Sequence, residues 1–296
     1  MMQREWYGTL VSLAGVLCNL VLFAVKLAMG LAANSAAVLS DAFNNLTDAG
    51  CSLTLAIGFH AAGKAPDERH PFGHGRIEYI SGLIVACLIM ATGLAVGKFA
   101  LERLLDPQPV GWNAFVCFGL ICTMLVKIVM ALFYRRANKT LQSPAIQAGV
   151  TDSLSDVAVT GVTLFSFVVS GCTAFPVDAA TGLAVAGGIF FAGAKTAVDA
   201  LDPLLGKREN PVIERQIREL VLATQGIENI HGLTVHDYGP SRKYASAHIE
   251  IAASMKFVEV HDAVEQAVDS VRKNLKMDIV LLPEPLGSDS NLPIAF

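Results

Sequence analysis

The sequence predicts a membrane α-helical bundle of six transmembrane helices followed by a small cytoplasmic α+β domain. Of the 296 residues, 53% are hydrophobic and only 16% are charged, and the mean hydropathy is +0.51. Such a composition is too apolar for a single soluble domain. Six apolar stretches follow one another, and the sequence becomes charged after "LDPLLGKREN". These observations divide the chain into a membrane domain, 1–206, and a soluble domain, 207–296.

Each apolar stretch has about the 20 residues that a helix needs to cross a bilayer. The first stretch lacks a small-residue cleavage pattern, and we therefore interpret it as a helix rather than a signal peptide. The predicted spans cover residues 7–29, 36–61, 78–101, 112–134, 144–170 and 178–201.

Basic residues in the connections predict the orientation of the bundle. The segments on one side carry Arg4, then Lys64, Arg69 and Arg76, then Arg135, Arg136 and Lys139, and finally Lys207 and Arg208. The three opposite loops carry only Arg103. Because basic residues are retained on the cytoplasmic side, both termini and the soluble domain are expected in the cytoplasm. The compact form, without long histidine-rich loops, favours a bacterial inner (plasma) membrane.

The soluble domain is predicted to fold in the order helix, strand, strand, helix, strand. "PVIERQIRELVLATQ" and "FVEVHDAVEQAVDSVRKNL" have helical periodicity, whereas "HGLTVHDYG", "KYASAHIEIAA" and "MDIVLL" are typical of strands. This αββαβ order suits a sheet with helices on one face. The net charge of −4 gives no reason to expect nucleic acid as a partner.

Two of the predicted spans contain acidic residues at membrane depth. In "SDAFNNLTDAG", Asn44 and Asp48 are four residues apart and share one helix face. Asp152 and Asp156 repeat this spacing in "VTDSLSDVAV". An ionised carboxylate in the bilayer costs at least ~3 kcal/mol, and a like charge one turn away adds to that cost. A bound cation would offset such a cluster, so these four residues predict a metal-ion site.

The arrangement resembles the cation diffusion facilitator family, whose members export divalent metals in exchange for protons. That family has six spans with both ends cytoplasmic, paired (D/N/H)xxxD motifs on spans 2 and 5, and a ferredoxin- or metallochaperone-like αββαβ domain. "DERHPFGHGRIEY", between spans 2 and 3, is similar to the family's histidine-bearing loop. The resemblance implies a secondary active transporter rather than an enzyme, embedded in membrane lipid and forming a homodimer through its cytoplasmic domain.

The chemistry of the four residues favours Mn²⁺ as the transported ion. Three carboxylates and one amide, with no imidazole or thiolate, suit manganese better than zinc. The motifs also resemble those of the manganese-exporting branch of the family. Since the site has no histidine, the aspartates are expected to carry the protons of a Mn²⁺/H⁺ antiport by alternating access. A broad exporter of Zn²⁺, Fe²⁺, Co²⁺ or Cd²⁺ is the alternative.

One further acidic residue lies near these motifs. Asp41 precedes Asn44 by one turn and is a candidate for supporting the ligands or for the proton path. Packing against span 3 or span 6 explains an aspartate at this position equally well.

A second candidate metal site lies in the loop between spans 2 and 3. Asp67, His70 and His74 are spaced three and four residues apart, and the resemblance implies that they bind a metal ion. A solvated polar loop is the alternative. By the same resemblance, Arg76 and Asp202 match the positions of an interlocking salt bridge between spans 3 and 6.

The resemblance implies a third, regulatory site for divalent cations in the soluble domain. His231, His248 and His261 lie where some relatives bind two zinc ions. Leu282 occupies a position where those relatives have a histidine, which leaves Glu284 as the acidic candidate. A complete binuclear site is therefore not expected, and ordinary surface histidines are the alternative.

Two other functional classes fit the sequence less well. A membrane aspartyl protease uses one carboxylate from each of two helices, and its GxGD motif is absent from the acidic spans. A metal sensor that does not transport would not need four acid or amide groups at bilayer depth. An ion that crosses the membrane does need such groups, and they must bind it weakly enough for it to leave.

Overall fold

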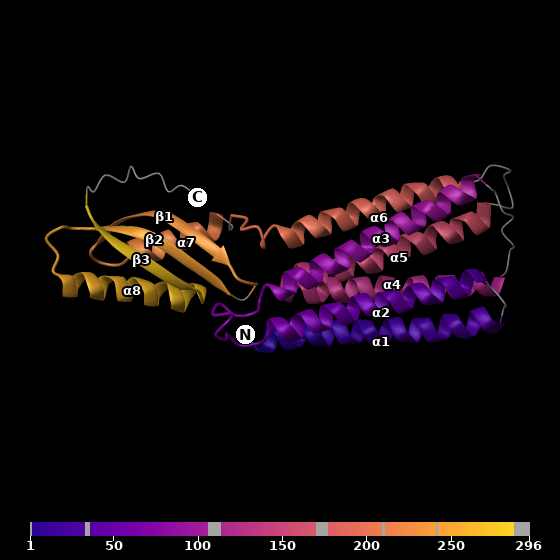
Figure 1. Cartoon of the computed structure of the whole chain (residues 1–296), viewed down its shortest axis with the longest axis horizontal. Coiled ribbons are helices and arrows are strands. Elements are labelled where there is room, and N and C mark those ends of the chain that lie inside the picture. Colours follow the sequence, from indigo (N-terminus) through magenta and orange to yellow (C-terminus); the bar gives the residue numbers. More distant parts are fainter. Residues whose placement is uncertain are drawn as a thin grey trace. The chain divides into compact units, whose positions relative to one another are not determined.

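The computed structural model describes residues 2–32, 36–105, 114–169, 177–208, 211–240 and 242–286. The chain divides into two compact units, Met1–Asp202 and Pro203–Phe296. The first unit consists of long helices and the second is built on a β-sheet (Figure 1).

Within the described residues, the first unit contains six long helices that follow the predicted spans in order. They are α1 (Met2–Ala32), α2 (Ala36–Ala62), α3 (Ile77–Leu105), α4 (Ala114–Leu141), α5 (Pro144–Val169) and α6 (Val177–Leu201). Successive helices run in opposite directions along the bundle (Figure 1). The closest pairs are α1 with α2, α3 with α6, and α4 with α5. α2 and α5 also contact each other, so the acidic pairs on these two helices lie in neighbouring parts of one bundle.

Three of these helices are long and apolar enough to cross a membrane. The stretches are Arg4–Ala28 in α1, Ile77–Glu102 in α3 and Phe118–Leu141 in α4. The described parts of α2, α5 and α6 do not reach the same level of length and hydropathy. For these helices a membrane-spanning position stays a prediction.

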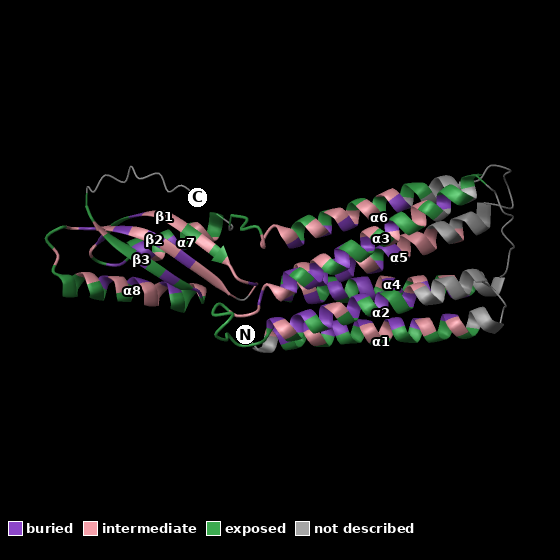
Figure 2. Cartoon of the chain, viewed as in Figure 1, coloured by how far each residue is buried: buried purple, intermediate pink, exposed green. Residues whose placement is uncertain are grey.

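The described core of the first unit lies in the half of the bundle where α1, α3 and α5 begin. Leu55 and Phe59 of α2, Tyr134 of α4 and Ile146 of α5 are all buried there (Figure 2). Large apolar side chains on the outer faces, such as Leu17 and Phe191, are exposed. Extended exposed apolar surface is typical of helices that face lipid or a partner protein.

Small residues bring α3 and α6 into close contact. At Gly93 of α3, a Cβ atom would lie 2.9 Å from the backbone nitrogen of Phe190 on α6. No side chain fits there without a shift of the backbone. Close approach at glycine is a common way for membrane helices to pack.

The second unit has the predicted order helix, strand, strand, helix, strand. Its elements are α7 (Pro211–Leu222), β1 (Ile227–Asp237), β2 (Lys243–Ile251), α8 (Phe257–Leu275) and β3 (Asp278–Pro285). The central strand β2 pairs antiparallel with β1 and parallel with β3. Along β2, Ala245, Ala247 and Ile249 are buried in the core that α7 and α8 complete. The alternate residues therefore face the other side of the sheet.

Candidate metal centre

The two predicted acidic pairs meet near the midpoints of α2 and α5. One oxygen from each of Asp48, Asp152 and Asp156 lies within 4.8 Å of the others. Asn44 joins them, since its Nδ2 donates a hydrogen bond to Asp156 Oδ1 over 3.3 Å. Asp48 and Asp156 are buried, whereas Asn44 and Asp152 are partly exposed. The spacing of four residues thus brings three carboxylates and one amide together, as predicted.

Lys127 of α4 also belongs to this cluster and was not predicted from the sequence. Its Nζ lies 2.6 Å from Asp48 Oδ2 and 2.5 Å from Asp156 Oδ2, and the residue is only 4% exposed. A sequence signal was present, because Lys127 is the single charged residue in the apolar stretch "MLVKIVMALF". A lone charge at bilayer depth is costly and usually has a functional partner.

A small polar cavity adjoins the cluster. It has a volume of about 20 Å³, and its lining includes Asn44, Lys127 and Asp156 together with Thr123 and Thr160. This volume accommodates about one water molecule. Thr123 precedes Lys127 by one turn of α4, and Thr160 follows Asp156 by one turn of α5. The cavity therefore extends from the carboxylates towards the end of the bundle where α2 and α4 begin.

A hydrogen-bonded chain of neutral side chains lies on the opposite side of the cluster. Ser52, one turn after Asp48, accepts a hydrogen bond from Asn19 Nδ2 over 3.4 Å. The hydroxyls of Ser52 and Tyr134 are 3.3 Å apart. This chain links α1, α2 and α4 between the carboxylates and the apolar core.

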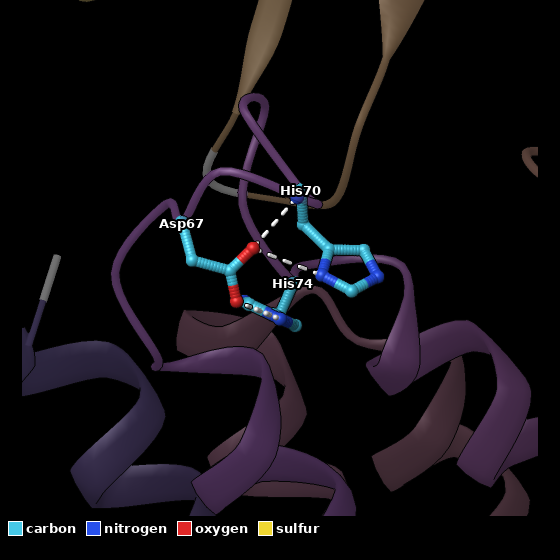
Figure 3. Close-up of side chains that lie close together, drawn as sticks. All are labelled: Asp67, His70 and His74. Atoms are coloured by element: carbon cyan, nitrogen blue, oxygen red, sulfur yellow. Dashed lines mark hydrogen bonds and ion pairs between the residues drawn. The ribbon is translucent and has the colours of Figure 1, made fainter.

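The loop residues Asp67, His70 and His74 form a second cluster, between α2 and α3 (Figure 3). Asp67 Oδ1 lies 3.1 Å from His70 Nδ1, and Asp67 Oδ2 lies 3.5 Å from His74 Nε2. The two imidazole rings are 4.4 Å apart. His74 Nδ1 is buried without a hydrogen-bond partner among the described residues. The three side chains thus present oxygen and nitrogen atoms to a common point.

The backbone of this loop holds Asp67 in its ionised form. The N–H of His70 donates to Asp67 Oδ1 over 2.7 Å, and the N–H of Arg69 donates to the same oxygen over 3.0 Å. The hydrogen bond from His70 is the main cause that lowers the pKa of the Asp67 carboxyl below its usual value. An ionised carboxylate between two imidazoles is a suitable donor set for a divalent cation.

Three of the four residues predicted in the soluble domain lie together on the helix-free face of the sheet. His248 Nδ1 lies 2.5 Å from Glu284 Oε1, and His231 Nε2 lies 3.4 Å from Glu284 Oε2. Glu250, which was not predicted, lies 3.8 Å from His231. The fourth residue, His261, is exposed on α8, and its described ionic contact is with Glu265 one turn later. Leu282 lies opposite His248 in the register of β2 and β3.

Two further predictions concern residues at the helix ends and near the cluster. Arg76 directly precedes α3 and Asp202 directly follows α6, so both lie at the same end of two closely packed helices. Their salt bridge stays a prediction. Asp41 belongs to α2, but its side chain lies outside the described residues.

Two family models match the chain. The cation efflux transmembrane domain matches residues 12–205, and the cytoplasmic domain of cation efflux proteins matches residues 210–285. An uncharacterized transporter, MJ0449, of Methanocaldococcus jannaschii is 27% identical over 258 residues, which cover 87% of this chain and 90% of the relative. The cation-efflux pump FieF of Escherichia fergusonii is 27% identical over 290 residues, with 96% and 95% covered. FieF of Escherichia coli shows the same identity and coverage.

Proposed function

The chain belongs to the cation efflux family, also called cation diffusion facilitators, and we propose that Asn44, Asp48, Asp152 and Asp156 bind the metal ion that it exports. One observation carries this proposal: three carboxylates from two helices of the transmembrane domain converge within 4.8 Å. Three ionised carboxylates carry three negative charges in a buried site, and a divalent cation offsets two of them.

We propose Mn²⁺ as the physiological substrate. The ligand set contains oxygen donors from carboxylates and an amide, and the described residues around it add no imidazole or thiolate ligand. Such donors suit Mn²⁺, whereas sites selective for Zn²⁺ more often use imidazole or thiolate. The alternative substrates Zn²⁺, Fe²⁺, Co²⁺ and Cd²⁺ are separate outcomes of a competition experiment.

We further propose that the protein works as a proton antiporter by alternating access. The carboxylates that release the metal would take up protons, since metal and proton compete for the same oxygens. We also propose that the chain has six spans with both termini in the cytoplasm. It forms a homodimer through the second unit. The distribution of basic residues supports this orientation, and a bacterial inner membrane is the proposed location.

The loop cluster and the sheet cluster are proposed as auxiliary cation sites. Asp67, His70 and His74 offer a carboxylate and two imidazoles at short distances. On the sheet, His231, His248 and Glu284 offer a similar set, with Glu250 as a fourth donor in place of the missing histidine at position 282. His261 is not included, because its described contact is with its own helix.

Transport by full-length protein in sealed vesicles tests the main proposal. A metal-sensitive dye inside the vesicles reports Mn²⁺ entry when a pH gradient is applied. We expect Asp156→Asn, which keeps the shape of the side chain, to abolish entry, whereas Asp269→Asn on the exposed face of α8 retains the wild-type rate. Equal rates for Asp156→Asn and the wild type would contradict the assignment of the site.

Competition between metals tests the substrate separately. With Mn²⁺ and Zn²⁺ present together, we expect the wild type to transport Mn²⁺ in preference. Asp152→His introduces an imidazole at the site and is expected to increase transport of Zn²⁺. Preference of the wild type for Zn²⁺ would show that the donor atoms do not determine the selectivity. Loss of the rate on removal of the pH gradient is expected for an antiporter, whereas an unchanged rate would indicate passive flux.

A further inference from the structure

Lys127 places a positive charge at the position where the proposed metal ion would bind. Its ammonium group donates hydrogen bonds to Asp48 Oδ2 on α2 and to Asp156 Oδ2 on α5, and so links the two helices. We infer that Lys127 is a tethered cation that occupies the metal site of the empty transporter and withdraws when the metal ion binds. This inference rests on the proposed transport function and adds a competing group to it.

Geometry prevents the ammonium and the ion from occupying the same bridge. A small divalent cation binds carboxylate oxygens at about 2.0–2.2 Å. The Nζ atom already lies between the two oxygens, at 2.6 Å and 2.5 Å. An ion at that position would overlap with the nitrogen, and the two positive charges would repel each other strongly in a buried site. Binding of the ion between Asp48 and Asp156 therefore requires Lys127 to move.

The adjoining cavity provides polar groups that can receive the ammonium. Lys127 itself lines this cavity, and so do Thr123 and Thr160; the buried Lys26 of α1 lines it as well, so Lys127 shares the cavity with a second basic side chain. The hydroxyl of Thr123 donates its hydrogen to the carbonyl of Leu120 over 3.0 Å. Among the described contacts this oxygen accepts no hydrogen bond, so it can accept one from an ammonium group on the same helix. Lys127 can leave the carboxylates without entering lipid.

A tethered cation serves the two halves of a transport cycle. Buried carboxylates without a counter-charge are strongly destabilising, so the empty site needs compensation before the helices can rearrange. The positive charge of Lys127 compensates the carboxylates of Asp48 on α2 and Asp156 on α5. During release, the same ammonium competes with the bound ion and lowers its affinity. An ion held by three carboxylates alone would leave more slowly.

Binding of Mn²⁺ to full-length protein in lipid nanodiscs tests this inference by calorimetry. Lys127→Met removes the competing charge, and we expect it to bind Mn²⁺ at least about tenfold more tightly than the wild type. Lys127→Arg is expected to bind Mn²⁺ more weakly, because a guanidinium holds carboxylates through paired hydrogen bonds. Lys98→Met, which removes an exposed lysine from α3, serves as the control for loss of one charge.

A further variant tests the withdrawal of the ammonium without changing any charge. Thr123→Val removes the acceptor oxygen from the cavity and is expected to weaken Mn²⁺ binding in the wild-type background. In the Lys127→Met background the same substitution is expected to have no effect on affinity. This dependence on Lys127 distinguishes the inference from a general role of Thr123 in packing.

The outcomes separate this inference from the proposed function. If Lys127→Met binds Mn²⁺ no more tightly than the wild type, or if Lys127→Arg binds it more tightly, Lys127 is a structural bridge and the inference is wrong. Should Lys127→Met fail to fold, the Lys127→Arg and Thr123→Val affinities decide the question. If the wild type itself neither binds nor transports Mn²⁺, Zn²⁺ or Cd²⁺, the proposed function fails independently of Lys127.

Discussion

A buried ion pair at one end of the bundle leads to a quantitative prediction about stability. Arg4 in the first turn of α1 donates to both carboxylate oxygens of Glu78 in α3, at 2.7 Å and 3.0 Å. The same guanidinium donates to the carbonyl of Leu141, the last residue of α4, at 2.6 Å and 3.1 Å. Arg4 thus joins three helix ends, and the Glu78 side chain is only 1% exposed.

Arg4→Met removes the charge but keeps much of the length of the side chain. It leaves Glu78 buried without its described partner, which destabilises a protein by about 3–5 kcal/mol. For a unit of this size, that loss corresponds to a fall in melting temperature of roughly 6–20 °C. Glu78→Gln keeps an acceptor for Arg4 and is expected to have a smaller effect. In the double variant Arg4→Met, Glu78→Gln, the loss of unfolding free energy is expected to be smaller than the sum of the losses in the two single variants.

Thermal unfolding in detergent, followed by fluorescence at one fixed heating rate, measures these differences. Lys98→Met serves as the control, since its ion pair with Glu102 is exposed and 3.8 Å long. An exposed pair of this kind contributes about 0–1 kcal/mol. A melting temperature of Arg4→Met within one or two degrees of the control would refute the reasoning. Additive effects in the double variant would show that Arg4 and Glu78 do not act as a pair.

Three other predictions concern separate parts of the chain. Gly93→Ala should lower the melting temperature because its Cβ would meet backbone of α6, whereas Gly187→Ala, with no atom within 4 Å, should not. Asp67→Ala removes the acceptor for two backbone N–H groups and should accelerate tryptic cleavage after Arg69, whereas Asp67→Asn keeps an acceptor and should resist cleavage better. An equal cleavage rate for these two variants would contradict this account of the loop. Leu282→His adds an imidazole to the sheet cluster and should tighten Zn²⁺ binding to the full-length protein, measured by calorimetry; unchanged affinity would count against a cation site there.

Periodicity predicted much of the candidate site. Residues four apart on a helix share a face whatever the surrounding structure, so Asp48 approached its partners on α5 as expected. The same local rule gave the αββαβ order of the second unit. Local patterns say nothing about which other helix faces the cluster. Lys127 contributes from α4, 79 residues after Asp48, and only the packing of three helices brings it there.

The sheet cluster shows the same limit. Alternation along β2 places His248 on the face opposite the buried alanines, but the partners of His248 depend on strand pairing. Glu250 was missed because its contact with His231 depends on the pairing of β1 with β2, in which His231 lies opposite His248 and Glu250 lies opposite Asn229. His261 was included because of the resemblance to the family, and in the structure it is exposed on α8 beside Glu265.

The apolar packing that follows the carboxylates along α2 has a consequence for how an ion could leak. From Asp48 to Phe59, α2 rises by roughly 16 Å at 1.5 Å per residue. Along this distance the side chains of Leu55, Phe59 and Tyr134 are all buried. A dehydrated divalent ion faces a very high electrostatic barrier in such a layer. If Asp48 and its partners bind a transported ion as proposed, we expect this layer to insulate the loaded site, and the helices must move before ions can be exchanged at that end.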